Sequence, residues 1–165
     1  MDSKMINIII EALGQTIYMV FFSTLFASVL GFILGIIVTV TSPTGLRPNI
    51  FIYKSLDVII NVLRSFPFII LIVFIIPLTR AIVGTPIGET AAIVPLTIAA
   101  APFVARIIES ALKEVDPGVI EAAKSFGASN LQIIFKVMLK EAVPAIISGL
   151  TLTIINIIGY SAMAG

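Results

Sequence analysis

Residues 14–40, GQTIYMVFFSTLFASVLGFILGIIVTV, decide the structural class of this chain. The run has no charged side chain, and a helix of roughly 20 apolar residues is long enough to cross the hydrocarbon layer of a bilayer. Proline and glycine in the TSPTG that follows, residues 41–45, then end the helix. The stretch predicts a transmembrane helix, and with it an all-α integral membrane protein.

The composition extends this class to the whole chain. Of the 165 residues, 59% are hydrophobic and 12% are charged, and the mean hydropathy is +1.18. Further apolar runs predict a four-span helical bundle, with the later spans at about residues 58–78, 88–105 and 143–164. The second and third of these four spans contain prolines, which a membrane helix tolerates where neighbouring protein or a cavity satisfies the backbone.

Basic residues predict how the bundle is oriented. About residues 106–142, between the third and fourth spans, hold five of the ten Lys and Arg side chains, whereas the loop between the second and third spans holds only Arg80. Because cytoplasmic loops are enriched in basic residues, we expect the longer segment to be cytoplasmic. Residues 1–11 are then an extracytoplasmic segment, with no cleaved signal peptide expected because Asp2 and Glu11 spoil its basic region.

The absence of certain residue types excludes most active sites. The chain has no Cys and no His, so it cannot form a thiolate or imidazole metal site, a disulfide, or a nucleophile activated by histidine. It also has no GxxxxGK[ST] loop for nucleotide phosphates. We therefore expect no catalytic residue, no metal and no cofactor on this chain, and its net charge of +1 gives no indication of nucleic-acid binding.

Small residues recur every four positions along the first span, at Ser23, Ala27, Gly31 and Gly35. This spacing aligns them on one side of a helix and allows a second helix to approach closely. We interpret the line as a packing face, although a surface that glides during gating would have the same pattern.

Residues 116–144 differ from the rest because polar and apolar residues alternate there with a helical period. Asp116 and Pro117 are typical of the cap and first position of a helix, which Gly127 would end in a left-handed conformation. Ser129 and Gln132 match the capping box of a second helix. The pattern predicts two short helices joined at a glycine corner, which either lie on the membrane surface or form a knob for a partner protein.

The same segment resembles the EAA loop of ABC importer permeases, through Glu121-Ala122-Ala123, Gly127 and the later Ile133-Ile134. Three further stretches extend the resemblance over residues 12–165: Arg64 to Ile70, Thr85 to Arg106, and Gly159 to Gly165. Together they are most similar to the methionine importers within this family, and they imply the type I importer permease fold. One departure is Lys140, which follows Leu139 where the family motif has proline.

The resemblance implies the chain's partners and its activity. A permease of this kind works in the cell inner membrane as a homodimer, with two ATP-binding cassette ATPase subunits and an extracytoplasmic solute-binding lipoprotein. It moves methionine, D- and L- and related amino acids, into the cytoplasm by alternating access. The implied ATPase-coupling residues are Glu121, Ala122, Ala123, Phe126 and Gly127. Because such permeases continue into further spans, we expect this chain to be truncated after Gly165.

Polar residues in the fourth span suggest a substrate pathway. Asn156 and Tyr160 share one face of the predicted helix, with Ser161 and Met163 close to it. These residues either line a path for a thioether amino acid or form hydrogen bonds and contacts between helices. Arg64 has a similar ambiguity, and we interpret it as an anchor to lipid head groups in preference to a gating or substrate residue.

Two other functions remain open. The same machine could carry another small solute, or the chain could be a passive pore or scaffold without an ATPase. The capped pair of cytoplasmic helices favours the importer, because a scaffold has no need of it.

Overall fold

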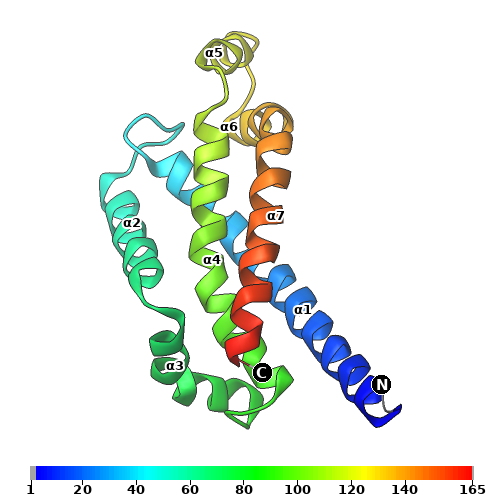
Figure 1. Cartoon of the computed structure of the whole chain (residues 1–165). Coiled ribbons are helices and arrows are strands. Elements are labelled where there is room, and N and C mark those ends of the chain that lie inside the picture. Colours follow the sequence, from blue (N-terminus) through cyan, green and yellow to red (C-terminus); the bar gives the residue numbers. More distant parts are fainter. Residues whose placement is uncertain (1–2, 165) are drawn as a thin grey trace.

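The computed structural model describes residues 3–164, and every element among them is a helix. Long helices alternate with short connections (Figure 1). In chain order they are α1 (Ser3–Thr41), α2 (Ile50–Ser65), α3 (Phe68–Val83), α4 (Glu89–Lys113), α5 (Pro117–Ser125), α6 (Asn130–Gln132), η1 (Ile133–Met138) and α7 (Leu139–Ala164). Three helices are long and apolar enough to cross a membrane, or four if the bent pair α2–α3 counts as one span. The prediction of an all-α, polytopic membrane protein is therefore confirmed.

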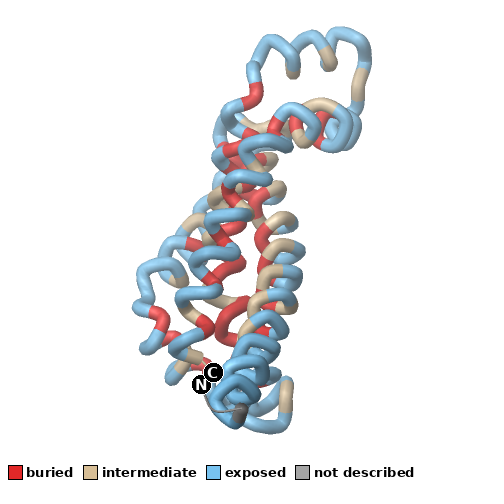
Figure 2. Tube along the Cα trace, turned by 45° about the vertical axis from the view of Figure 1, so that its right-hand side comes forward, coloured by how far each residue is buried: buried red, intermediate tan, exposed pale blue. Residues whose placement is uncertain are grey.

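Helix α4 is the centre of the bundle. In its most apolar 18-residue window 67% of the residues are buried, against 22% in the corresponding windows of α1 and of the continuous helix that ends in α7. Figure 2 shows the buried positions concentrated along the middle of the bundle, with exposed positions around it. Helices α1 and α7 therefore turn apolar surface outward, as membrane-embedded helices do.

The small residues of α1 make its contact with α4. Ser23 and Ala27 are fully buried. A Cβ atom added at Gly31 would lie 2.7 Å from the Ala101 carbonyl oxygen, and one added at Gly35 would lie 2.8 Å from that of Ala105. Since real Cβ atoms do not approach a carbonyl oxygen so closely, no larger residue fits without moving the helices apart. The line of small residues is confirmed as a packing face.

The predicted span over residues 58–78 is not one helix. Helices α2 and α3 meet at an angle of 108°, with the break at Phe66 and Pro67. Proline disfavours a helical conformation in the preceding residue, and Phe66 accordingly has an extended backbone with φ −72° and ψ 127°. The apolar run suggested one continuous span because prolines are tolerated in membrane helices, but here the proline separates two helices.

Three other helices run further than the predicted spans. Helix α1 begins at Ser3 instead of at about residue 14. Helix α4 continues to Lys113, and α7 continues back through η1 and α6, so that residues 130–164 form one helical stretch. Within it, residues 133–138 are π-helical. Pro144 lies six residues after this wider turn. It has no amide hydrogen to donate to the carbonyl of Lys140, so one helical hydrogen bond is missing close to the π-helical turn.

The connections lie at two ends of the bundle. Residues 42–49 and the α5–α6 segment lie at one end, while residues 84–88 and both ends of the described chain lie at the other (Figure 1). Helix α5 projects beyond the bundle and contacts little besides η1. The fold thus separates a projecting knob from the packed helices.

Candidate functional site

Helix α5 begins with the cap that the sequence predicts. The Asp116 carboxylate accepts a hydrogen bond of 2.6 Å from the amide of Gly118, and Pro117 occupies the first helical position. Proline has no amide hydrogen to leave unpaired there. The start of the knob is therefore fixed by two adjacent residues.

The corner after α5 is a closed hydrogen-bonded turn. Gly127 has φ +78°, and its amide donates to the Lys124 carbonyl at 2.9 Å. The amide of Ala128 donates to the Ala123 carbonyl at 3.1 Å. This pair of bonds is the Schellman motif, which requires a left-handed residue at the position of Gly127. The predicted glycine corner is confirmed.

A capping box holds the other side of the corner. The Ser129 amide donates to the Gln132 side-chain oxygen at 2.9 Å, and the Gln132 amide donates to the Ser129 hydroxyl at 3.4 Å. Ile133 and Ile134 follow directly and are buried in the main core. The corner therefore joins α5 rigidly to the packed helices through η1.

Helix α5 has an inner and an outer face. Pro117, Ile120, Glu121 and Lys124 line a cavity of about 270 Å³ between α5, α4 and residues 39–46, so this is the inner face. Val119, Ala122 and Phe126 lie on the opposite side of the helix, and we call them the α5 outer face. Phe126 is 91% exposed. Together with Val119 and Ala122, this ring gives the α5 outer face an apolar surface.

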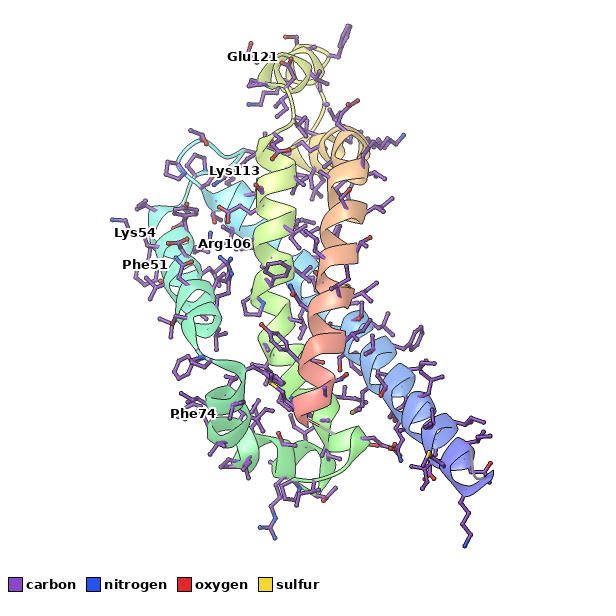
Figure 3. The ribbon with its side chains drawn as sticks, in the orientation of Figure 1. Phe51, Lys54, Phe74, Arg106, Lys113 and Glu121 are labelled. Carbon is purple, nitrogen blue, oxygen red and sulfur yellow. The ribbon has the colours of Figure 1, made fainter. Side chains whose placement is uncertain are left out.

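The predicted coupling residues thus have different surroundings. Glu121 projects from the knob (Figure 3) and lines the 270 Å³ cavity beneath α5, whereas Ala122 and Phe126 belong to the outer face. Ala123 is half-buried and packs against the main core, and Gly127 forms the corner. The structure brings all five together in one knob.

A charged cluster at the base of the knob was missed by sequence analysis. The Arg106 guanidinium pairs with Asp57 of α2 and, at 2.5 Å, with Glu109 one turn further along α4. Glu109 also pairs with Lys113 at 2.6 Å, and its side chain is only 6% exposed. Figure 3 shows Arg106 and Lys113 on the side of α4 that faces α2. The only signal in the sequence was the helical spacing of these charges, which names no partner on α2.

The cluster ties α2 to the end of α4 that leads into α5. Arg106 donates a further hydrogen bond of 2.9 Å to the side-chain oxygen of Asn61, and the Lys113 ammonium lies 5.6 Å from the ring centre of Tyr53. A buried carboxylate with cations on both sides is stabilised by them, and loss of either cation would leave charge unpaired. The α2–α4 contact therefore combines this charged cluster with apolar packing of Ile60 against Ala105.

An inner cavity of about 180 Å³ lies where α2, α3, α4 and α7 meet. It brings together Asn156 and Tyr160, the predicted pair in the fourth span, and adds Arg64, Phe66 and Phe103. The ring of Tyr160 stacks on Phe68 with centroids 4.5 Å apart and an interplanar angle of 19°. Four of its twelve lining residues are aromatic, and the polar or charged groups among the others are one guanidinium, one amide and the hydroxyl of Thr153.

Two predicted pathway residues lie outside this lining. The Ser161 hydroxyl is buried and donates to the Ile158 carbonyl of its own helix at 2.8 Å. Met163 is 58% exposed on the surface of α7. Among residues 3–164, no group of three or more acidic side chains is placed to hold a metal ion.

Comparison with known proteins identifies the family. The family model described as "binding-protein-dependent transport system inner membrane component" matches residues 29–165. The chain belongs to this family. It is accordingly a multi-pass inner-membrane permease component of an ABC transporter, with a helical bundle of the type I importer kind.

Individual relatives extend the comparison over the whole of this chain. It is 46% identical over 165 residues to the D-methionine transport system permease protein MetI of Escherichia coli K12, covering all of this chain and 76% of the relative. It is 51% identical over 159 residues to the probable MetI of Vibrio cholerae, covering 96% of this chain and 71% of the relative.

Solved structures share the fold. An inward-facing structure of the MetNI methionine ABC transporter superposes with a TM-score of 0.96 at 45% identity, over 99% of this permease and 76% of that chain. A chain of an amino acid ABC transporter crystallised with histidines superposes with a TM-score of 0.78 at 24% identity, over 98% and 72%, which reflects the fold alone.

Proposed function

We propose that this permease is the membrane-spanning subunit of an ATP-driven importer that moves methionine, in its D- and L- forms, into the cytoplasm. The observation that carries the proposal is the 46% identity to the E. coli D-methionine permease over the whole of this chain. The superposition on the methionine transporter with a TM-score of 0.96 supports it further. Related amino acids are the nearest alternative substrates.

The knob transmits the action of a separate ATPase. Its outer face offers an exposed aromatic ring, Phe126, beside the small residue Ala122, a combination that can enter a groove on a partner. The Schellman corner at Gly127 and the capping box after it link this face to η1 and α7 without a flexible joint. A push on α5 therefore reaches the membrane helices, as coupling to ATP hydrolysis on the partner requires.

The assembled transporter contains two copies of the permease, two ATP-binding cassette ATPases and an extracytoplasmic solute-binding protein. The knob and residues 42–49 face the cytoplasm, and the end of the bundle with residues 84–88 faces outward to receive the substrate. The distribution of Lys and Arg supports this orientation. ATP binding shifts the population between inward-open and outward-open states, which is alternating access.

The substrate pathway passes the inner cavity. Asn156 supplies hydrogen-bonding groups, and Tyr160, held by stacking on Phe68, supplies an aromatic wall. Met163 is exposed near the end of the same helix, where it would contribute to a gate, while the buried Ser161 packs beside the pathway. The cavity has no acidic side chain in its lining, as suits a carboxylate-bearing substrate.

Uptake in proteoliposomes tests the proposal. The full-length permease, its ATPase and the binding protein would be reconstituted, and ATP-dependent uptake of radiolabelled L- and D-methionine measured against competing amino acids and dipeptides. We expect saturable uptake that unlabelled methionine abolishes. Uptake of another solute with no methionine transport would leave an importer with a different cargo, and equilibration without ATP would instead indicate a passive pore.

A further inference from the structure

Arg64 is an exposed residue that lies well away from the end of the bundle with residues 42–49. It is in the last turn of α2, 14 residues after the helix begins at Ile50, which corresponds to about 21 Å along the axis at 1.5 Å per residue. The cavity that it lines also contains Ala99, Ala100 and Phe103, all within two residues of the middle of α4. This distance from residues 42–49, together with its place in the cavity lining, favours a role for Arg64 in the cavity over an anchor to the head groups at that end.

Arg64 also differs from the neighbouring cations in its partners. Arg106 and Lys113 are both paired with carboxylates. Within residues 3–164, Arg64 has no carboxylate within salt-bridge distance, and its guanidinium carbon lies 6.0 Å from the centre of the Phe103 ring. A charged side chain inside a membrane is costly unless it faces a polar cavity or a partner. The accessible cation is therefore available to an anionic group that enters the cavity.

The break between α2 and α3 places this cation where transporters bind substrate. Interrupted helices near the middle of the membrane commonly form substrate sites, because their backbone groups and side chains are open to the cavity. Here the break at Phe66 and Pro67 lies directly after Arg64, and helix α3 starts without a side-chain cap. Phe66 and Phe68, on either side of the break, both line the cavity.

We propose that Arg64 binds the carboxylate of the transported amino acid in this cavity, while the rings of Phe103 and Tyr160 hold its apolar side chain. The proposal rests on the importer function given above and adds the group that recognises the substrate. Guanidinium and carboxylate form paired, charge-assisted hydrogen bonds, and a thioether packs favourably against aromatic rings. The amide of Asn156 also lies in the lining and is suited to the substrate's ammonium or carboxylate, whereas the Thr153 hydroxyl already donates to the Gly149 carbonyl of its own helix.

A direct binding assay distinguishes the specificity of this site from that of the solute-binding protein. The permease–ATPase complex, purified without the binding protein, would be assayed with radiolabelled methionine by scintillation proximity, and methioninol, which lacks the carboxylate, would be the competitor. We expect wild-type complex to bind methionine and to reject methioninol. Arg64→Gln should weaken methionine binding about tenfold or more, as loss of a charge-assisted pair does, and should remove most of the discrimination. Arg64→Lys should retain part of both.

Arg80→Gln is the matched control, because Arg80 is an exposed arginine of α3 that does not line the cavity. Co-purification of the ATPase and unchanged melting temperatures would establish that each variant is assembled. Unchanged methionine affinity and discrimination in Arg64→Gln would overturn the proposal, as would absence of saturable binding to the wild-type complex. If the wild-type importer carries a different amino acid, that amino acid and its amino alcohol replace methionine, so failure of the methionine assignment stays distinct from failure of the Arg64 assignment.

Discussion

Two regions of this permease require glycine, for different reasons. On α1, Gly31 and Gly35 are helical and lie against α4, and they are needed because a side chain at either position would collide with that helix. At the corner of the knob, a Cβ added to Gly127 would meet no other atom within 4 Å, but the residue has φ +78°. One region depends on the size of the residue and the other on the sign of a backbone angle.

Because of this difference, substitutions in the two regions should have independent effects on the structure. Added volume on α1 separates the helices that form the core, so the fold itself is lost. A strained corner changes only the direction of α5, because the bundle is packed by other residues. Substitutions that distinguish side-chain size from backbone conformation therefore test whether the knob and the bundle are stabilised independently of each other.

The largest effect is expected for Gly35→Ala. Its Cβ would lie 2.6 Å from the Ile108 Cβ, so α1 and α4 must separate, at a cost of about 1–3 kcal/mol or more. We expect a lower melting temperature in detergent and poor recovery of folded protein. Gly14→Ala, on the same helix with no atom within 4 Å, is the control and should be neutral or slightly stabilising. Equal melting temperatures for the two variants would remove volume as the reason for glycine on α1.

The next largest effect is expected for Gly127→Val. A β-branched residue is strongly disfavoured at positive φ, which costs about 1–3 kcal/mol and forces the corner to reopen. The bundle should stay folded while co-purification of the ATPase and methionine uptake are lost. Gly127→Asn should be milder, because asparagine tolerates the left-handed region. If valine and asparagine behave alike, conformation does not explain the glycine at the corner.

A smaller effect is expected where charges hold α2 to α4. Asp57→Asn removes one of the two carboxylates around Arg106, and because the Asp57 side chain is 32% exposed we expect a loss of only about 0.5–1 kcal/mol. Melting temperatures of Asp57→Asn, Arg106→Gln and the double variant would be compared. The two effects should not add, since both remove the same ion pair. Additive effects would show that Asp57 and Arg106 act separately.

The smallest effect is expected for Glu121→Lys. Glu121 is exposed but lies on the inner face of α5, opposite the face proposed to dock. Reversing its charge should therefore weaken ATPase association only a few-fold at low salt, and less as added salt screens the charge. Binding would be measured over a range of salt concentrations, with Lys54→Ala of α2 as the control. Full ATPase binding and uptake in both Glu121→Lys and Gly127→Val would leave α5 as a surface connection without a coupling role.

The sequence predicted local structure better than contacts between distant segments. The cap at Asp116 and the corner at Gly127 follow from rules that act within a few residues, and both are present in the structure. The break at Pro67 was not predicted, because the same residue is compatible with a continuous membrane helix when its neighbours compensate. Only the tertiary fold distinguishes these two cases.

The candidate sites show the same limit. Asn156 and Tyr160 share a helical face, so the period of the helix was sufficient to group them, and the structure places both at one cavity. Arg64 could not be assigned to that cavity from sequence, since the cavity is formed jointly by α2, α3, α4 and α7 and depends on the bend between α2 and α3. The pairing of Asp57 with Arg106 joins residues 49 positions apart, which no local pattern specifies.

The length of α1 has a consequence for how the permease sits in the bilayer. Its 39 residues extend about 58 Å, nearly twice the hydrocarbon thickness of about 30 Å. Tilt alone would need an angle of about 60°, beyond the usual range of up to about 40°. Part of α1 must therefore lie outside the acyl chains, and the exposed charges of Lys4 and Glu11 identify its N-terminal turns as that part. In membranes of different thickness, a different length of α1 would lie in water. Helix α1 can therefore accommodate hydrophobic mismatch without a movement of α4 and α7.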